Sequence, residues 1–233
     1  MLNTITIMVY YRIINNTRWY YRLKPHKETD GKVKRGLFSD TPRHTLTNAL
    51  IVAWSYHDVS SGKVFLLFSH FKSYLEYGIY QLKLPPHERC FYEIILGEST
   101  QKPHFDIDIK SSTGSIIDGE SIKDNLIDGI VKVLSDKGIN INIATDILIY
   151  TSHNEKKQSY HIVVNNYCHA NNIEARAFYD AVMDHVDPIY TEAGWIDKAV
   201  YSPTQQFRIV GSQKSDQTEL RDSRRYGIIM GWK

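Results

Sequence analysis

Two aspartates lie one residue apart in the run HFDIDI at residues 104–109. In a β-strand alternate side chains share a face, so Asp106 and Asp108 would project together while their apolar neighbours face the core. Two carboxylates roughly 7 Å apart along one face repel each other unless a cation lies between them. Oxygen ligands of this kind suit Mg²⁺ or Mn²⁺, which keep open positions for water and phosphate. The alternative interpretation is a solvated strand face.

A second set of polar side chains, Lys157, Ser159 and His161, alternates along another strand-like run. A cation, a hydroxyl and an imidazole on one face offer three kinds of donor to phosphate oxygens. A lone histidine in a strand is more often a structural residue than a ligand. The matched spacing of all three side chains favours a phosphate site.

A third carboxylate, Asp197, stands between Ile196 and Lys198, and two basic residues, Arg208 and Lys214, follow it. The alternative is that Asp197 caps a turn and Arg208 is an ordinary surface charge. Taken with the two earlier groups, these residues form a set suited to nucleotidyl transfer. In such a reaction, two cations held by carboxylates activate a 3′-hydroxyl and bridge a triphosphate, and basic groups neutralise the leaving pyrophosphate.

The elements that must position these residues follow a recognisable order from residue 90 onward. The hydrophobic spacing predicts a strand region ending at Ile109, a helix at 119–137, strands at 146–150 and 159–164, a helix at 172–186 and a last strand at 206–211. This is the β-α-β-β-α-β order of a ferredoxin-like or RRM-like module, whose two helices cover one sheet face. The other face would be open, and the aspartates would lie there.

The first 89 residues predict a mixed α/β lobe packed on the module at 90–233, which together make one compact catalytic domain of the α+β class. Between Arg12 and Arg43 there are nine Lys or Arg against three acids, interleaved with aromatic rings. Charge and stacking surfaces suit single-stranded nucleic acid. A solvated loop beside a structural aromatic cluster would look the same. The candidate template-binding residues are Arg12, Arg18, Trp19, Arg22, Lys34 and Arg35. His70 and Lys72 could reach the nucleotide or the template, but a structural role is the more frequent one for such residues.

Composition places the chain among ordinary globular proteins. It has 233 residues, of which 42% are hydrophobic and 23% charged. No apolar run approaches the length of a membrane span and the N-terminus does not resemble a signal peptide, so we expect a soluble intracellular protein without a membrane partner. Two cysteines, Cys90 and Cys168, are too few for a zinc cluster, so we expect buried thiols and no structural zinc. The chain carries no GxxxxGK[ST] loop of the kind that cradles phosphates.

The segments FDID, SYH and IDKAVYSPTQQFRIVGSQK appear in this order, and in this respect the chain resembles the archaeo-eukaryotic primase superfamily. The resemblance covers residues 90–214 and is strongest to the primase-polymerase branch, in particular to the primase half of the primase-helicases of poxviruses and other large DNA viruses. Lys198 stands where an apolar residue is expected. The zinc module that many relatives carry after the core is missing.

The resemblance implies a DNA primase and polymerase that makes and extends primers on single-stranded DNA from NTPs or dNTPs during viral DNA replication, in the host cytoplasm or nucleus. Three aspartates would ligate two Mg²⁺ or Mn²⁺ ions: Asp106, Asp108 and Asp197. The residues that would contact nucleotide phosphates are Lys157, Ser159, His161, Arg208 and Lys214, and Tyr201 is a candidate neighbour of the sugar. A helicase would follow in a longer chain or act as a separate one.

Two other functions remain open at this point. A repair-type polymerase or a nuclease would use the same carboxylates for a different reaction. A catalytically inert module would instead bind single-stranded nucleic acid through the basic aromatic segment and the open sheet face.

Overall fold

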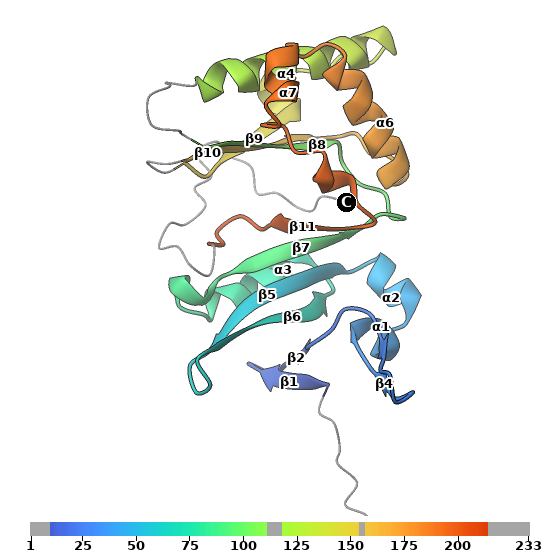
Figure 1. The fold of residues 1–233 in the computed structure, drawn as a ribbon, viewed down its shortest axis with the longest axis vertical. Helices are drawn as coiled ribbons and strands as arrows, with labels where there is room; N and C mark the ends of the chain where they lie inside the picture. Colours follow the sequence, from blue (N-terminus) through green and yellow to red (C-terminus); the bar gives the residue numbers. More distant parts are fainter. Residues whose placement is uncertain (1–9, 111–117, 154–156, 214–233) are drawn as a thin grey trace, which may run out of the picture. The chain divides into compact units, whose positions relative to one another are not determined.

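The computed structural model describes residues 10–110, 118–153 and 157–213 (Figure 1). Backbone contacts divide these residues into two compact units, one of residues 10–94 and 207–213 and the other of residues 95–206. Each unit has its own cluster of buried hydrophobic side chains. The domain boundary expected after residue 89 stays a prediction.

The first unit is built on a six-stranded sheet with the strand order β1-β2-β6-β5-β7-β11. A separate two-stranded ribbon, β3-β4, follows β2 in the chain. The elements that lie in the first unit are β1 (Tyr11–Ile14), β2 (Thr17–Tyr20), β3 (His26–Lys27), β4 (Val33–Lys34), α1 (Leu37–Asp40), α2 (Arg43–Thr47), β5 (Leu50–Asp58), β6 (Lys63–Phe71), α3 (Tyr74–Leu82) and the 3₁₀ turn η1 (Pro86–Glu88). The strands β7 (Phe91–Leu96) and β11 (Thr204–Arg208) also belong to the six-stranded sheet, and the boundary between the units falls within each of them.

Aromatic rings fill the core of the first unit. The ring of Trp19 lies 5.1 Å from that of Trp54 in an edge-to-face contact, and its indole N–H donates a 2.9 Å hydrogen bond to the Tyr80 hydroxyl. Edge-to-face pairs of this kind add about 0.5–1.5 kcal/mol to the area that they bury. Two aromatic residues of the N-terminal segment, Trp19 and Tyr20, are thus buried.

The second unit is an antiparallel three-stranded sheet, β8-β10-β9, with α4 and α6 on one face (Figure 1). Its elements are β8 (His104–Lys110), α4 (Gly119–Asp136), α5 (Ile143–Asp146), β9 (Ile147–Thr151), β10 (Lys157–Val164), α6 (Asn172–Met183), α7 (Pro188–Glu192) and the 3₁₀ turn η2 (Ala199–Tyr201). The two long helices and the three strands confirm the elements expected from the sequence, although α6 ends at Met183 and not near residue 186.

The last predicted strand, at 206–211, forms only in part, since β11 covers Thr204–Arg208, and it joins a different sheet. β11 is an edge strand of the six-stranded sheet, so the prediction that it completes the helix-covered sheet is wrong. Beside β8 lies instead a short segment around Ile196, joined by an antiparallel bridge between Ile107 and Ile196. The physical reason is burial: Ile196 packs in the helix-covered core of the second unit, whereas Ile209, just after β11, packs in the core of the first.

The two cysteines differ in environment. Both are free thiols, and Cys90 is buried as expected. Cys168 is exposed, so the expectation of two buried thiols is wrong for it.

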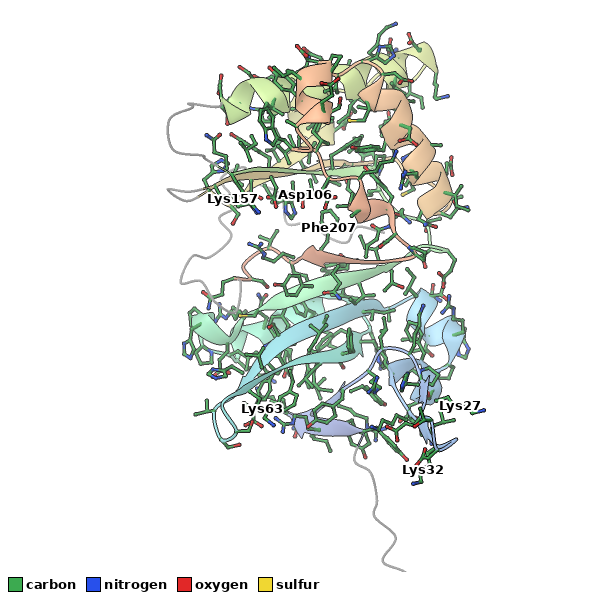
Figure 2. All side chains as sticks on the ribbon, viewed as in Figure 1. Lys27, Lys32, Lys63, Asp106, Lys157 and Phe207 are labelled. Carbon is green, nitrogen blue, oxygen red and sulfur yellow. The ribbon has the colours of Figure 1, made fainter. Side chains whose placement is uncertain are left out.

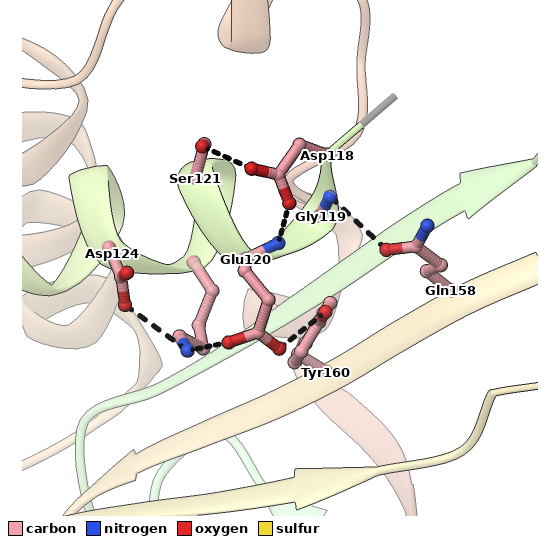
Figure 3. A network of polar contacts seen from close by, with 8 residues as sticks. Asp118, Gly119, Glu120, Ser121, Asp124, Gln158 and Tyr160 are labelled. Atoms are coloured by element: carbon pink, nitrogen blue, oxygen red, sulfur yellow. Dashed lines mark hydrogen bonds and ion pairs between the residues drawn. The ribbon is translucent and has the colours of Figure 1, made fainter. Parts of the chain in front are cut away.

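Hydrogen bonds fix the first turn of α4 to β10 (Figure 3). The backbone N–H of Gly119 donates to Gln158 Oε1 at 3.1 Å, and the Tyr160 hydroxyl donates to Glu120 Oε1 at 2.9 Å. Glu120 is also paired with Lys123, and this ion pair is the first cause of the lowered pKa of the carboxyl. Burial raises the pKa of Tyr160, so its hydroxyl remains a proton donor at neutral pH. The helix thus holds the even-numbered residues of β10.

We predict that Gly119→Ala destabilises the protein, because a Cβ there would lie 2.1 Å from Gln158 Oε1 and would displace that side chain. Loss of one hydrogen bond costs about 1 kcal/mol. The matched control is Gly78→Ala in α3, where a Cβ would have no neighbour within 4 Å and removal of a helical glycine should stabilise. Thermal unfolding followed by circular dichroism should move in opposite directions for the two variants, and equal shifts would contradict the role of Gln158.

Candidate functional site

The antiparallel register of β8 and β10 brings the predicted side chains together. Asp106 lies opposite His161, and Asp108 lies opposite Ser159. Opposed residues of paired strands share a face, so all four side chains lie on the same side of the sheet. Figure 2 shows Asp106 and Lys157 on the side away from α4 and α6. The residues thus share the face that the helices do not cover, although Ser159 and His161 on that face are buried.

Both aspartates are paired with nitrogen groups of β10. The His161 Nε2 atom lies 2.9 Å from Asp106 Oδ1, and the Lys157 Nζ atom lies 2.5 Å from Asp108 Oδ2. The side chains of the first pair are mostly buried, 9% exposed for His161 and 18% for Asp106. Cross-strand pairing therefore offsets the repulsion between two carboxylates on one strand.

Ser159 lies between these two pairs and is buried. Its backbone N–H donates a 3.1 Å hydrogen bond to His153 Nδ1. His153 thereby holds the end of β10 that carries Lys157 and Ser159, a role that no motif in the sequence indicated.

Asp197 enters the site from the opposite edge of β8. Its backbone N–H donates to Asp106 O at 2.8 Å, and the Asp108 N–H donates to Trp195 O at 2.8 Å. These bonds flank the bridge between Ile107 and Ile196, so Asp197 stands directly across from Asp106. The Asp197 Oδ1 atom accepts a 2.7 Å hydrogen bond from the Ala199 N–H, so this residue also caps the turn that follows.

The donor set suits a divalent cation in chemistry but is not arranged as a closed metal site. Among the residues that the structure describes, no group of three or more His, Cys, Asp or Glu side chains is placed to hold a metal ion. The Asp108 Oδ1 atom is nevertheless buried and accepts no hydrogen bond from the described part of the chain. A buried carboxylate oxygen without a partner is costly unless a ligand satisfies it. Asp106 and Asp108 therefore fit a cation, provided that Lys157 leaves Asp108.

A buried polar network holds the strands of the site in place, and sequence reasoning missed most of it. His104 is fully buried; its Nδ1 lies 2.7 Å from Lys102 O and its Nε2 lies 3.0 Å from Gln205 Oε1. Burial lowers the pKa of His104. The Tyr201 hydroxyl donates to His104 O. One feature of the sequence did indicate this role. His104 stands two residues before Asp106 on β8, so its side chain lies on the same face of the sheet as the site.

Tyr201 is 4% exposed and its hydroxyl is engaged with the backbone, so the expectation that it borders a nucleotide sugar is wrong. Arg208 lies in β11, and that part of the strand belongs to the first unit. Lys214 lies outside the described residues. The described geometry of the site therefore comprises the side chains of the second unit alone.

The candidate template-binding residues separate into structural and surface residues. Trp19 is 0% exposed in the core, so it cannot stack on a base, and the prediction is corrected for this residue. Arg12 hydrogen-bonds to Asp58 at 3.2 Å and to Tyr21 at 2.9 Å, which gives it a structural role. Arg18 and Arg22 are exposed.

Two further cations of the basic segment are engaged in ion pairs. Lys34 is paired with Glu28, and Arg35 with Asp40. Both lie at the surface, where such pairs contribute little to stability.

Comparison with known proteins relates the chain to proteins of a large DNA virus. It is 28% identical over 195 residues to a protein of African swine fever virus (isolate Pig/Kenya/KEN-50/1950) named "Putative helicase/primase complex protein". The match covers 76% of this chain and 17% of the relative, and the protein of the Badajoz 1971 strain is 27% identical over 205 residues. The chain thus spans about a sixth of the length of these curated relatives. No family model matches it.

The chain is therefore a distant relative of proteins from a large DNA virus that are named for a helicase/primase complex. Within the described residues, none of the helices combines the length and the apolar character that crossing a membrane requires.

We predict that Tyr201→Phe lowers the stability of the protein, because it leaves the buried His104 carbonyl without this donor. Loss of one hydrogen bond costs about 1 kcal/mol, which corresponds to a fall in melting temperature of about 2–4 °C for a chain of this size. Tyr190→Phe is the matched control, since no hydrogen bond of its hydroxyl is seen among the described residues and it lies on α7. A Tyr201→Phe protein that melts like the Tyr190→Phe protein would show that the hydroxyl does not support β8.

Proposed function

We propose that this chain is a primase-polymerase that starts and extends strands on a single-stranded DNA template from NTPs or dNTPs. The observation that carries the proposal is the paired register of β8 and β10, which sets two carboxylates against an imidazole, a hydroxyl and an ammonium on one sheet face. The relationship to the African swine fever virus proteins supports a role in DNA replication.

In this proposal Asp106 and Asp108 hold Mg²⁺ or Mn²⁺, with Asp197 as a third ligand. The bound ions would supply the positive charge that activates a 3′-hydroxyl and stabilises the transferred phosphoryl group. Asp197 is suited to join them because it stands across from Asp106. To bind a metal ion, the Asp197 carboxylate would have to leave the Ala199 N–H. The backbone hydrogen bonds on either side of Ile196 would keep Asp197 at the edge of the site when it does so.

Lys157, Ser159 and His161 would bind the incoming triphosphate. The ammonium of Lys157 lies 2.5 Å from Asp108 Oδ2 and neutralises this carboxylate. Binding of a cation to Asp108 would release the ammonium for a phosphate oxygen. His161, whose Nε2 lies 2.9 Å from Asp106 Oδ1, would present its ring to the same phosphates. Binding of the metal and of the nucleotide would thus be coupled, because the metal would take the place of Lys157 on Asp108 and the phosphate would take the place of Asp108 on Lys157.

The name of the relatives, which mentions a helicase/primase complex, also supports a helicase as a partner. We infer that the chain works with a replicative helicase, either as a separate protein or as part of a longer chain.

Replacing Asp106 and Asp108 together by Ala should abolish primer synthesis. The purified chain, a single-stranded DNA template, labelled nucleotides and Mn²⁺ or Mg²⁺ should yield short oligonucleotides without a primer, and the double variant should lose at least 1000-fold in rate, about 4 kcal/mol. Asp128→Ala is the control, because this exposed aspartate of α4 lies away from the site. Full synthesis by the double variant would contradict the assignment.

The same assay separates the other functions. Extension of a supplied primer without initiation would identify a repair-type polymerase, and shortening of the template would identify a nuclease. Template binding with no metal-dependent reaction would identify an inert binding module.

A further inference from the structure

The first unit contains a polar cavity that the proposed catalytic site does not use. Its volume is about 450 Å³, within the range of sites for small molecules, roughly 300–1,000 Å³. It lies beside the single backbone pairing of β2 with β6, at Tyr20 and Phe68, and its wall also includes residues of the β1–β2 turn, of α1 and α2 and of the start of α3. All of these residues belong to one unit.

The lining offers both hydrogen-bond donors and acceptors. His70 lines the cavity, and its Nδ1 atom is buried with no hydrogen-bond partner in the described part of the chain. Burial lowers the pKa of this imidazole, so the ring is neutral at physiological pH. The carboxylates of Asp40 and Glu76 also line the cavity. Proteins recognise unpaired bases by hydrogen bonds to the base edges, and groups of this kind can make them.

An exposed cation stands at the same cavity. The guanidinium of Arg18 lies 4.4 Å from the centre of the Tyr11 ring and within 3.5 Å of the Tyr20 hydroxyl, so ring stacking orients it. Arg18 is the only Lys or Arg among the described lining residues. A single guanidinium suits one phosphodiester group better than a triphosphate, for which several cations are usual.

The two carboxylates of the lining are held in different ways. Arg35 is paired with Asp40, whereas Glu76 accepts a hydrogen bond from the neutral backbone N–H of Lys72 and keeps its negative charge. Carboxylate oxygens can accept hydrogen bonds from the exocyclic amino group of a base, as they do from cytosine N4. Thymine has no amino group, so the lining favours cytosine over thymine.

We propose that this cavity binds one nucleotide of a single-stranded DNA, with the base among His70, Asp40 and Glu76 and its phosphate on Arg18. The inference rests on the proposed function only in taking the bound strand to be a template. Of the basic residues between Arg12 and Arg43, only Arg18 lines this subsite in the described part of the chain.

The test measures binding of the full chain to fluorescent dC₁₂ and dT₁₂ by anisotropy, with EDTA and without nucleotides. We expect wild type to bind dC₁₂ at least 3-fold more tightly than dT₁₂. Thr45→Phe places a ring into the cavity from α2 and should weaken dC₁₂ binding at least 5-fold and remove the preference. Thr47→Phe is the matched control, since Thr47 lies on the same helix, is exposed and does not line the cavity. Both variants are first compared with wild type by thermal unfolding.

A second variant does not depend on the packing around α2. Arg18→Ala should reduce the salt dependence of dC₁₂ binding by about 0.7 in the slope of log K against log salt, the value for one contact on a single strand. Arg176→Ala in α6 removes the same charge elsewhere and should leave the slope unchanged.

The possible outcomes separate this inference from the proposed function. Unchanged dC₁₂ binding by folded Thr45→Phe, or an unchanged salt slope for Arg18→Ala, would overturn the subsite. Equal displacement of dC₁₂ by free dCMP at the same nucleotide concentration would show a site for free nucleotides and would also overturn it. If wild type binds dC₁₂ as expected but makes no primers, the proposed function fails while the subsite stands. If wild type makes primers and Thr45→Phe binds dC₁₂ normally, the subsite fails while the proposed function stands.

Discussion

The site depends on the antiparallel pairing of β8 with β10. Because the side-chain period of a strand is two residues, one register fixes which carboxylate meets which partner, and a slip by one residue would turn every one of these side chains to the other face. In the observed register Asp106 meets His161, and Asp108 lies beside the strand position of Ser159 and the ammonium of Lys157. The same register sends Ile107 and Tyr160 into the core under the helices.

The register of β8 and β10 thus determines both the core and the site. The apolar residues that α4 and α6 cover hold the register, and the polar residues between them receive their positions as a consequence. The first turn of α4 strengthens this link, because its bonds to Gln158 and Tyr160 alternate with the site residues of β10. On the outer side of β8, the backbone bridge at Ile196 places Asp197 by the same rule.

Much of this arrangement could be predicted from the sequence, since it follows from local periodicity. The alternation of Asp106 with Ile107 predicts both a strand and the face of each side chain, and the helical spacing at 119–137 agrees with α4. The partner of β11 could not be predicted, because strand propensity does not specify which sheet a strand joins. That choice depends on which core can bury Ile209, a long-range property. Trp19 shows the same limit, since an aromatic ring among cations suits a binding surface and a core equally well.

The pairing of Lys157 with Asp108 also offsets the repulsion between the like charges of this site. An isolated carboxylate with a buried oxygen would raise the free energy of the folded chain, and the ammonium offsets this cost through a contact at 2.5 Å. The pair is partly exposed, 21% for Lys157 and 41% for Asp108, so solvent screening keeps its contribution small and the contact can exchange. A stronger, fully buried pair would compete with any ligand of either partner. A weak internal counter-ion is therefore compatible with the proposed function, in which a cation would replace the ammonium on Asp108 and a phosphate would replace the carboxylate on Lys157.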